Sequence, residues 1–480
     1  MSVSFSSTSE HTKAAVESIA DLNPNAADVL ITTVITSLVT DLGVVSPTAS
    51  GLLTIYDGSH NKATSVDGYF VAPKKFNGAD INRQTTSITY GGYVETGIGA
   101  NTVAVPGIYK LLEFVYEKYA SLPLDVLFEY PVKIAKEGFL LADVTLEYFE
   151  YSLEPIYSWD PTSKKQLSIL ETEKPEEAVM KMELLSDTYQ YIADHGFNEF
   201  YFGDIGKALC KTIFNGGGHV TMEDLNSYEL IYDSKFTATY KNLKLTGHSG
   251  PSIGGLMVLK YLNVLQSNVE DLISELHKVY IDRKDNFETF DDRTDMITNE
   301  ISKAITSPST IQFSISDTKN NHFSLTVSSG YGSGLLCPQT GMYFNNSLGE
   351  IELNPQGFLG ETNGDRLISN MSPMVIEDTN GIFTIGSPGA DRISSAIAMV
   401  INNYLQTNDW NKSIDLPRFH VNQDKSIRSE PEAIKTNEDT VVTKENDMYF
   451  GGVCMTGLIN NSSLFAKGDK RRGDVSAKTK

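Results

Sequence analysis

The stretch STIQFSISDTKNNHFSLTVSSGYGSG, residues 309–334, alternates polar and apolar side chains in two runs joined by a polar segment. The polar members of both runs carry a hydroxyl or an amide, and they are Thr310, Gln312, Ser314, Ser316, Ser324, Thr326 and Ser328. Successive side chains of a strand point to opposite faces of a sheet, so each run predicts a strand with one apolar and one polar face. The stretch therefore predicts a β-hairpin whose polar face is built mainly of hydroxyl groups.

The register of this hairpin follows from parity. Both polar faces lie on the same side only if opposed residues have numbers that sum to an even value. A sum of 638 leaves a loop of five residues, 317–321, whose Asp, Asn and Lys suit a turn. This register places Thr310 opposite Ser328, and opposed side chains lie about 5 Å apart at Cβ, within reach of a hydroxyl–hydroxyl bond.

The alternation does not by itself assign a function to the polar face. A half-exposed hairpin with a solvated polar face has the same pattern, so that alternative stays open. A threonine hydroxyl is a weak nucleophile and needs a base beside it. His322 lies across the turn and the other histidines are scattered, so no histidine is placed to be that base.

Composition excludes several classes of protein. The chain has 480 residues and a formal net charge of −22, which disfavours a nucleic-acid partner. Cys210, Cys337 and Cys454 are far apart and odd in number, which predicts packed thiols and neither a disulfide framework nor a zinc site. The start lacks a basic signal region, and the apolar stretch 27–40 is too short to span a bilayer. We therefore expect a soluble, cytoplasmic protein with no membrane partner.

The order of predicted elements is typical of α+β proteins, with helices mostly first and strands mostly later. Helices are predicted over 26–39, 106–120, 124–136, 175–194, 202–214, 253–266, 268–286 and 392–404, and a hairpin is predicted with its turn near residues 58–61. Residues 426–446 are charged and poor in apolar side chains, which predicts a loop or linker. The basic tail from residue 467 predicts a solvated, partly frayed end.

Several segments resemble the gamma-glutamyltransferase family of N-terminal-nucleophile (Ntn) hydrolases. After the hairpin these are PQTGMYFNNSLGE (338–350), GDRLISNMSP (364–373) and IFTIGSPGADRI (382–393). Before it, NPNAADVLITTVITSLVT (23–40) and PSIGGL (251–256) match in family order, and FAKGDKRRGD (465–474) resembles the family's terminal aspartate-arginine motif. The resemblance implies a four-layer αββα Ntn-hydrolase sandwich with helical elaboration in the N-terminal part.

The resemblance also implies self-cleavage. The matching bond here is Ser309–Thr310, which divides the chain into a large-subunit region, 1–309, and a small-subunit region, 310–480. Thr310 then supplies the nucleophilic hydroxyl, and its freed α-amino group, with an ordinary pKa of roughly 7.7–8.0, supplies the base. This removes the need for a histidine. The implied product is a heterodimer of the two fragments without a cofactor or metal, and its further oligomeric state stays open.

Individual positions carry over from the family. Ser328 matches the hydroxyl that orients the nucleophile, and Gly389 and Ala390 match a Gly-Gly pair whose N–H groups form the oxyanion hole. On the substrate side, Glu350 matches an aspartate that binds the substrate's α-amino group, and Ser369 matches one of two serines near its carboxylate. Alternatives remain, because GSPG is also a tight turn and Glu350 is also readable as a surface acid.

Four departures affect recognition more than catalysis. Thr310-Ile311-Gln312 stands where the family has Thr-Thr-His, which predicts a loss of polar support, and Asn370 replaces the second serine. Tyr69 replaces the arginine of Gly-Arg-Glu-x-Ala-Pro and brings neither a positive charge nor a bidentate fork. The glycine run is shortened at residues 50–53. Arg83 is a candidate substitute for the missing arginine from another loop.

These observations predict a self-processing gamma-glutamyltransferase-like amidase or acyltransferase. Its substrate is a gamma-glutamyl compound such as glutathione, or a related amide of the acylase kind, and the acceptor is water or an amine. The alternative is a non-catalytic, unprocessed family member that retains the fold as a structural or binding protein.

Overall fold

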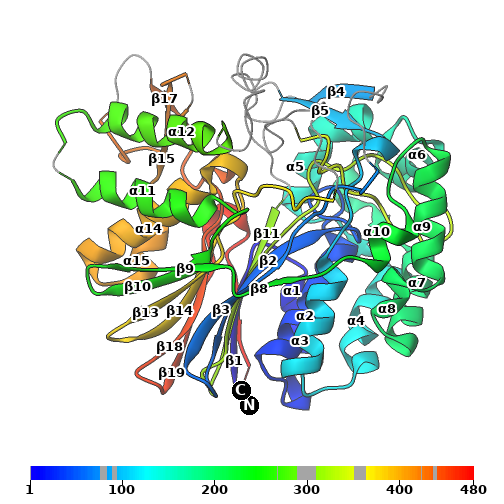
Figure 1. The fold of residues 1–480 in the computed structure, drawn as a ribbon, viewed down its shortest axis with the longest axis horizontal. Helices are drawn as coiled ribbons and strands as arrows, with labels where there is room; N and C mark the ends of the chain where they lie inside the picture. The colour runs from blue at the N-terminus through cyan, green and yellow to red at the C-terminus, as the bar shows by residue number, and fades with distance from the viewer. Residues whose placement is uncertain are drawn as a thin grey trace.

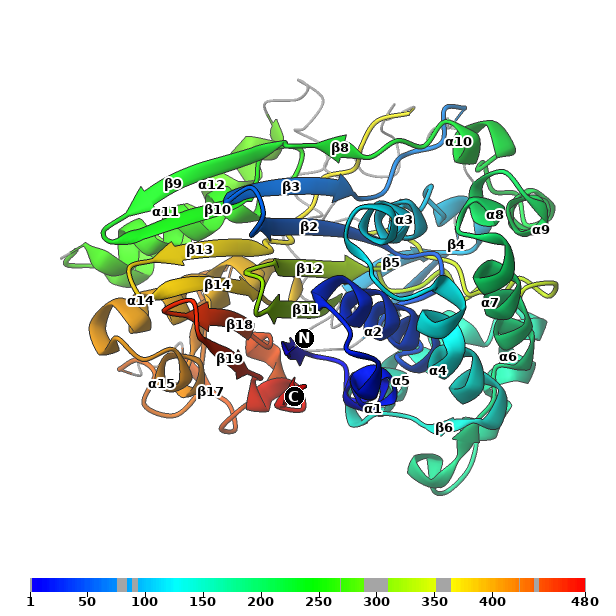
Figure 2. The ribbon, with the colours of Figure 1, turned by 90° about the horizontal axis from the view of Figure 1, so that it is seen from below.

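The computed structural model describes residues 2–75, 84–88, 94–267, 269–288, 310–350, 364–422, 424–435 and 440–479. Two antiparallel sheets face each other at its centre (Figures 1 and 2). The first has the order β20 (Val475–Lys478), β1 (Val3–Ser7), β11 (Thr310–Asp317), β12 (His322–Ser328), β2 (Ser50–Asp57), β3 (Lys62–Gly68), β8 (Ile231–Tyr232). The second has the order β19 (Ser463–Lys467), β18 (Cys454–Ile459), β14 (Gly381–Gly386), β13 (Met374–Asp378), β10 (Leu243–His248), β9 (Lys235–Tyr240).

Helices cover the outer face of each sheet, which completes four layers (Figure 1). The layer on the first sheet includes α1 (Thr12–Ile19), α2 (Ala26–Thr40), α3 (Ile108–Tyr119) and α4 (Leu124–Glu137). The layer on the second sheet consists of α11 (Gly254–Gln266), α12 (Leu272–Glu288), α14 (Ile393–Thr407) and α15 (Trp410–Asp415). The predicted αββα sandwich is confirmed.

The predicted helical elaboration extends outward from α4 (Figure 1). It contains α5 (Asp143–Ser152), α6 (Pro161–Leu167), α7 (Glu183–His195), α8 (Asn198–Tyr201), α9 (Asp204–Asn215) and α10 (Met222–Asn226). Small sheets add β4 (Gln84–Ile88) with β5 (Val94–Ile98), β6 (Phe139–Leu140) with β7 (Val179–Met180), and β15 (Phe419–Val421) with β16 (Ile427–Ser429) and β17 (Thr440–Val442). The single helix predicted over 175–194 is wrong at its start, because β7 precedes α7 there.

Helix α2 begins where the sequence predicts. The Asn25 side chain accepts hydrogen bonds from the N–H groups of Ala27 and Asp28, and the Asp28 carboxylate accepts one from the Asn25 N–H, which is a capping box. All 15 residues of α2 are buried. The hydroxyls of Thr33, Thr36 and Thr40 each bond to a carbonyl one turn earlier, so a helix rich in hydroxyls fits inside the protein.

The hairpin has the predicted register. Thr310 opposes Ser328, Gln312 opposes Thr326, and Ser314 opposes Ser324. In the turn, Asp317 Oδ1 accepts hydrogen bonds from the N–H groups of Lys319 and Asn321, at 2.9 and 3.0 Å. The parity argument is therefore confirmed.

The polar face of this hairpin lies between the two sheets. Every residue of β11 and β12 is buried, so the alternative of a solvated face is wrong. Three serine hydroxyls reach the second sheet, where Ser314 donates to Cys454 O at 3.0 Å, Ser324 donates to Ile385 O at 2.9 Å, and Ser316 bonds Thr456 Oγ1 at 2.8 Å. Because buried hydroxyls are costly without partners, these bonds favour this particular facing of the sheets.

Gln312 is the centre of this polar seam. Its side chain is fully buried, its Oε1 accepts from Thr326 Oγ1 at 2.6 Å, and its Nε2 donates to Ser324 Oγ at 3.0 Å. A Cβ on Gly386 would lie 2.1 Å from Gln312 Oε1, so the amide rests directly on the second sheet. Gln312 therefore supports the seam between the sheets, and the expected loss of polar support at Thr310 stays a prediction.

The regions 1–309 and 310–480 share both sheets. In the first sheet β1 pairs with β11 and β2 pairs with β12, and in the second β10 pairs with β13. The last strand, β20, pairs with the first, β1. The predicted boundary at residue 309 therefore marks a cleavage site in the chain and does not separate two folding units.

The charged segment 426–446, predicted as a loop or linker, and the tail, predicted as solvated, both contain buried residues. Residues 427–429 form β16, and the next residue, Glu430, is 2% exposed. In the tail, Arg471 and Arg472 are each 4% exposed. The expectation of a frayed tail is wrong. The loop predicted over 426–446 is confirmed for the described residues outside β16 and β17, and residues 436–439 lie outside the described residues.

Two predictions from composition are checked here. Cys210, Cys337 and Cys454 are free thiols, as predicted. Within the described ranges, none of the helices combines the length and the apolar character needed to cross a bilayer.

We predict that His322 makes the folded state sensitive to acid. Burial lowers the pKa of His322 from 6.5 to about 3, and its ring bonds Ser316 Oγ and Asn320 Oδ1, each at 2.7 Å. In the unfolded chain His322 is protonated below about pH 6.5, whereas in the folded chain it stays neutral down to about pH 3. The free energy of unfolding therefore falls as the pH falls through this range. The expected slope from this residue is about 1.4 kcal/mol per pH unit.

Urea unfolding at about pH 7 and about pH 5 measures this loss, which should be smaller in His322→Gln. His60→Gln is the control, because the His60 side chain is 76% exposed. Equal losses in the wild type and in His322→Gln would contradict the prediction.

Candidate active site

Thr310 is the first residue of β11 and is 6% exposed. The sheet places it in one row with Ser328 on β12 and Ser50 on β2. Ser328 Oγ accepts a hydrogen bond from Gly330 N at 3.2 Å, which holds the chain as it leaves β12. The structure therefore brings Thr310 and Ser328 together as expected, and Ser309 lies outside the described residues.

The turn after β14 lies at the same end of the sandwich. Gln312 contacts Gly386, the last residue of β14. Ser314 and Ser316 of β11 bond Cys454 and Thr456 in that order, whereas β14 pairs with the same two residues in the reverse order. The strands β11 and β14 therefore run in opposite directions. Thr310 is two residues beyond Gln312, a step of about 6.6 Å along the strand. This step carries Thr310 toward residues 387–390, the turn that holds Gly389 and Ala390.

The backbone of this turn is unusual. Gly389 has φ +128° and Ala390 has φ +51°, and the left-handed region costs a residue with a Cβ about 1–2 kcal/mol. In the described part of the chain, neither N–H group donates to an acceptor. Two N–H groups left without acceptors are what an oxyanion hole needs. The backbone thus tolerates the alanine, and the role of the pair stays a prediction.

Contacts on both sides fix the turn. A Cβ on Gly389 would lie 3.2 Å from Gly451 Cα, so the two backbones are in close contact. Arg392 Nε donates to Tyr449 O at 2.6 Å, and the guanidinium lies 4.4 Å from the centre of the Tyr449 ring. Tyr280 of α12 donates to Asp391 Oδ2 at 3.0 Å. The turn is therefore held between α12 and residues 449–451.

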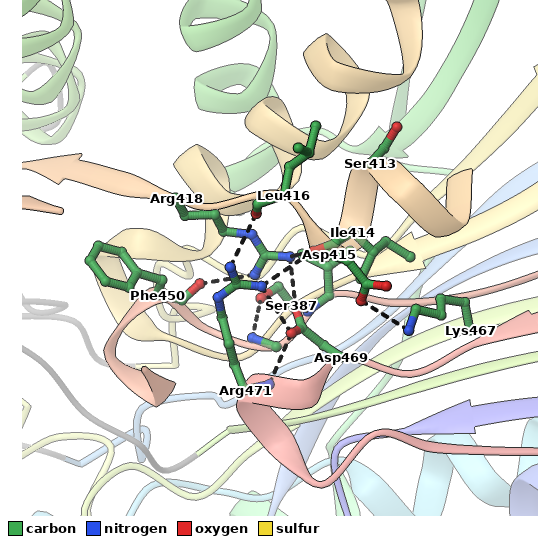
Figure 3. Close-up of polar contacts among 12 residues, drawn as sticks. Ser387, Ser413, Ile414, Asp415, Leu416, Arg418, Phe450, Lys467, Asp469 and Arg471 are labelled. Atoms are coloured by element: carbon green, nitrogen blue, oxygen red, sulfur yellow. Dashed lines mark hydrogen bonds and ion pairs between the residues drawn. The ribbon is translucent and has the colours of Figure 1, made fainter. Parts of the chain in front are cut away.

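A buried ion network supports the backbone of residues 450–453 (Figure 3). Asp469 bonds Arg418 Nη2 at 2.7 Å and Arg471 Nη1 at 3.2 Å (Figure 3). Arg471 also pairs with Glu430. When only side-chain atoms are counted, all four residues are at most 2% exposed. Burial acts to raise the pKa of Asp469, but the charges of Arg418 and Arg471 outweigh it and hold the pKa below its usual value.

This network connects to the turn through the backbone. Asp469 Oδ2 accepts from Val453 N at 2.8 Å, and Arg418 Nη1 donates to Phe450 O at 3.3 Å. Ser387 Oγ accepts from Gly452 N at 3.1 Å (Figure 3). The terminal aspartate-arginine motif therefore fixes the segment on which Gly389 rests.

Glu350 lies deep beside the row of hydroxyls. It is 2% exposed, so the alternative of a surface acid is wrong. A Cβ on Gly330 would lie 2.9 Å from Glu350 Oε1, which places the carboxylate over the turn that follows Ser328. Burial raises the pKa of Tyr148 and the nearby Glu350 charge adds to that rise, so the phenol stays neutral.

Tyr69 extends the same row across the sheet. Gly68 opposes Gly51, so the next residue, Tyr69, falls beside Ser50, about three strand spacings or roughly 14 Å from Thr310. Tyr69 is 2% exposed, and its ring meets Phe70 edge-on at 5.1 Å. The apolar cluster that contains both rings also includes Leu52, Leu348, Leu367 and Met371. Tyr69 is therefore a core residue at the far end of the row.

Arg366, which the sequence analysis did not single out, lies beside Tyr69. Its guanidinium donates to the Tyr69 carbonyl, to Tyr228 Oη and to the Glu229 carbonyl. The only signal was its position in GDRLISNMSP, and nothing in the spacing located its partners. Arg83, the candidate substitute, lies outside the described residues.

Ser369 and Asn370 follow Arg366 and pack on the PSIGGL segment. Ser369 O accepts from Ile253 N at 3.0 Å, and Ser369 Oγ accepts from Met371 N at 3.1 Å. A Cβ on Gly254 would lie 2.1 Å from Asn370 O, so glycine is needed for this contact. Both residues are buried, at 1% and 6% exposed, and their roles in substrate binding stay predictions.

The family model described as gamma-glutamyltranspeptidase matches residues 13–284 and 268–479. The chain belongs to this family. Its relatives include a glutathione hydrolase proenzyme of Bacillus subtilis (strain 168), 24% identical over 456 residues, which cover 81% of this chain and 76% of that one. The acylase ACY 1 proenzyme of Pseudomonas sp. (strain V22) is 24% identical over 366 residues, 68% of this chain and 65% of that one.

A solved structure gives the fold independently. The crystal structure of cephalosporin acylase from Bacillus halodurans aligns with a TM-score of 0.76 and 18% identity, over 99% of this chain and 95% of that one. The predicted family, Ntn-hydrolase fold and enzyme class are confirmed. The chain is an amidase-like Ntn hydrolase of the gamma-glutamyltranspeptidase family.

We predict that Asp469→Asn strongly destabilises the protein. The change keeps the shape of the side chain but leaves Arg418 and Arg471 with less negative charge in a buried site, which should lower the unfolding free energy by about 3–5 kcal/mol. Asp474→Asn is the matched control, because Asp474 is 45% exposed and pairs with Lys467 at 3.6 Å. The control should lose less than about 1 kcal/mol. Equal losses in urea unfolding would contradict a structural role for the network.

Proposed function

We propose that this chain is a self-processing amidase or acyltransferase that acts through Thr310. The observation that carries the proposal is the position of Thr310 at the start of a buried strand, opposite Ser328 and at the same end as the 387–390 turn. No histidine is needed, because cleavage at Ser309–Thr310 frees an α-amino group on the nucleophile itself.

Processing begins with an attack by Thr310 Oγ1 on the carbonyl carbon of Ser309. The C–N bond breaks as the C–O bond forms, which leaves an ester and a free α-amino group on Thr310. Water then hydrolyses the ester and gives the Ser309 carboxylate. The products are fragments of 309 and 171 residues (480 minus 309). Strand pairing between β1 and β11 and between β2 and β12 would hold them together as a heterodimer.

Turnover uses the same groups. The α-amino nitrogen takes the proton from Thr310 Oγ1 as the oxygen attacks the substrate amide, and Ser328 orients that oxygen. The N–H groups of Gly389 and Ala390 stabilise the oxyanion, and each such donor is worth roughly 2.7–4 kcal/mol. The amine leaves with the proton, and water or an amine acceptor then releases the acyl group from the threonyl ester.

The substrate class follows from the relatives. Glutathione hydrolase relatives favour a gamma-glutamyl compound, and the acylase relative favours another amide. In the first case Glu350 would bind the amino group, and Tyr69, Ser369 and Asn370 would lie near the carboxylate. The burial of Tyr69 in an apolar cluster favours the second case.

We predict that Thr310→Ala abolishes both processing and amide hydrolysis, because no other hydroxyl carries its own amino group. Thr310→Ser keeps both groups and should retain measurable processing and turnover. A denaturing gel and release of p-nitroaniline from acyl anilides measure the two steps. An active Thr310→Ala protein would overturn the assignment. A wild-type protein that stays intact and inert would support the non-catalytic alternative.

A further inference from the structure

The charge around Thr310 is negative on one side. Glu350 is buried over Gly330, next to the turn that Ser328 begins. A Cβ on Gly330 would lie 2.3 Å from Asn346 Oδ1 and 2.9 Å from Glu350 Oε1, so the amide and the carboxylate share the space above this glycine. A carboxylate this close to the nucleophile favours an acyl group that carries a cation.

Among the described residues, Arg366 and His248 offer no free positive charge at the far end of the same row. Arg366 is turned toward two carbonyls and Tyr228 Oη, and its Nε is 3.6 Å from Asp67 Oδ1. Burial lowers the pKa of His248 to about 4, although Asp67 partly offsets this, so the imidazole is neutral near pH 7.

The residues around Tyr69 are apolar or neutral side chains of the buried core. Tyr69, Leu52, Leu348 and Met371 belong to one cluster, and each is at most 3% exposed. Ser369 beside them donates or accepts hydrogen bonds without charge. A substrate carboxylate that enters here loses its hydration and gains no counter-ion from Arg366 or His248.

We propose that the preferred acyl donor carries a primary ammonium group and no carboxylate. This inference rests on the proposed function, because it names the acyl class that Thr310 would accept. The simplest member is a 4-aminobutanoyl amide, which has the chain length and amine position of a gamma-glutamyl group but lacks its carboxylate.

Four p-nitroanilide substrates test this proposal, and they differ only in two charged groups of the acyl part. The gamma-glutamyl substrate carries both the amine and the carboxylate, and the butanoyl substrate carries neither. The 4-aminobutanoyl substrate carries only the amine, and the glutaryl substrate carries only the carboxylate. We expect the amine to raise kcat/KM about ten-fold or more in each pair, as a hydrogen-bonded charge pair should. We expect the carboxylate to lower kcat/KM in each pair. A gamma-glutamyl value above the 4-aminobutanoyl value would overturn the inference and leave the proposed function standing.

Variants of Glu350 locate the source of the preference. In Glu350→Gln the ratio of 4-aminobutanoyl to butanoyl kcat/KM should fall about ten-fold, and in Glu350→Asp, which keeps the charge, most of the ratio should remain. Glu177→Gln is the control, because this side chain is 64% exposed, and its ratio should match the wild type. An unchanged ratio in Glu350→Gln would overturn the inference. Failure of the wild type to hydrolyse any of the four in a Thr310-dependent way would overturn the proposed function as well.

Discussion

The two sheets are joined by a seam of hydroxyl groups, and the position of Thr310 depends on it. Ser314, Ser316 and Ser324 bond groups of the second sheet, and Gln312 lies between them against Gly386. A slip of β11 by one residue would turn Gln312, Ser314 and Ser316 toward the apolar helix layer. The seam therefore fixes which residue stands at the end of β11 and which way its hydroxyl points.

The support for the candidate oxyanion turn is separate from this seam. Gly389 rests on Gly451, and residues 450–453 are held by the ion network of Arg418, Asp469, Arg471 and Glu430. Buried charges contribute little net stability, but they become costly when one partner is removed, so they favour a single arrangement. The end of the row at Thr310 is thus held by polar contacts from both sheets. The other end, around Tyr69, is packed with apolar side chains.

Sequence patterns predicted local features better than buried polar contacts. The start of α2 at Ala26 and the parity of the hairpin follow from residues close in sequence, and both are confirmed. A polar face that contacts water and a polar face that contacts a second sheet give the same alternation of side chains. The burial of the polar face was therefore not predictable from the sequence pattern. Glu430 and Arg471 are 41 residues apart and each lies in a charged segment, which made both segments look solvated. Arg366 was missed for the same reason, because its partners are backbone carbonyls brought near only by folding.

The central claim is that Thr310 becomes a chain terminus whose own nitrogen serves as the base. Reductive methylation of the purified native protein, followed by proteolysis and mass spectrometry, tests this directly. The account predicts a peptide that begins at Thr310 with a dimethylated α-amino group, together with a peptide that ends at Ser309. Recovery of only peptides that run unbroken from Ser309 into Thr310 would contradict it.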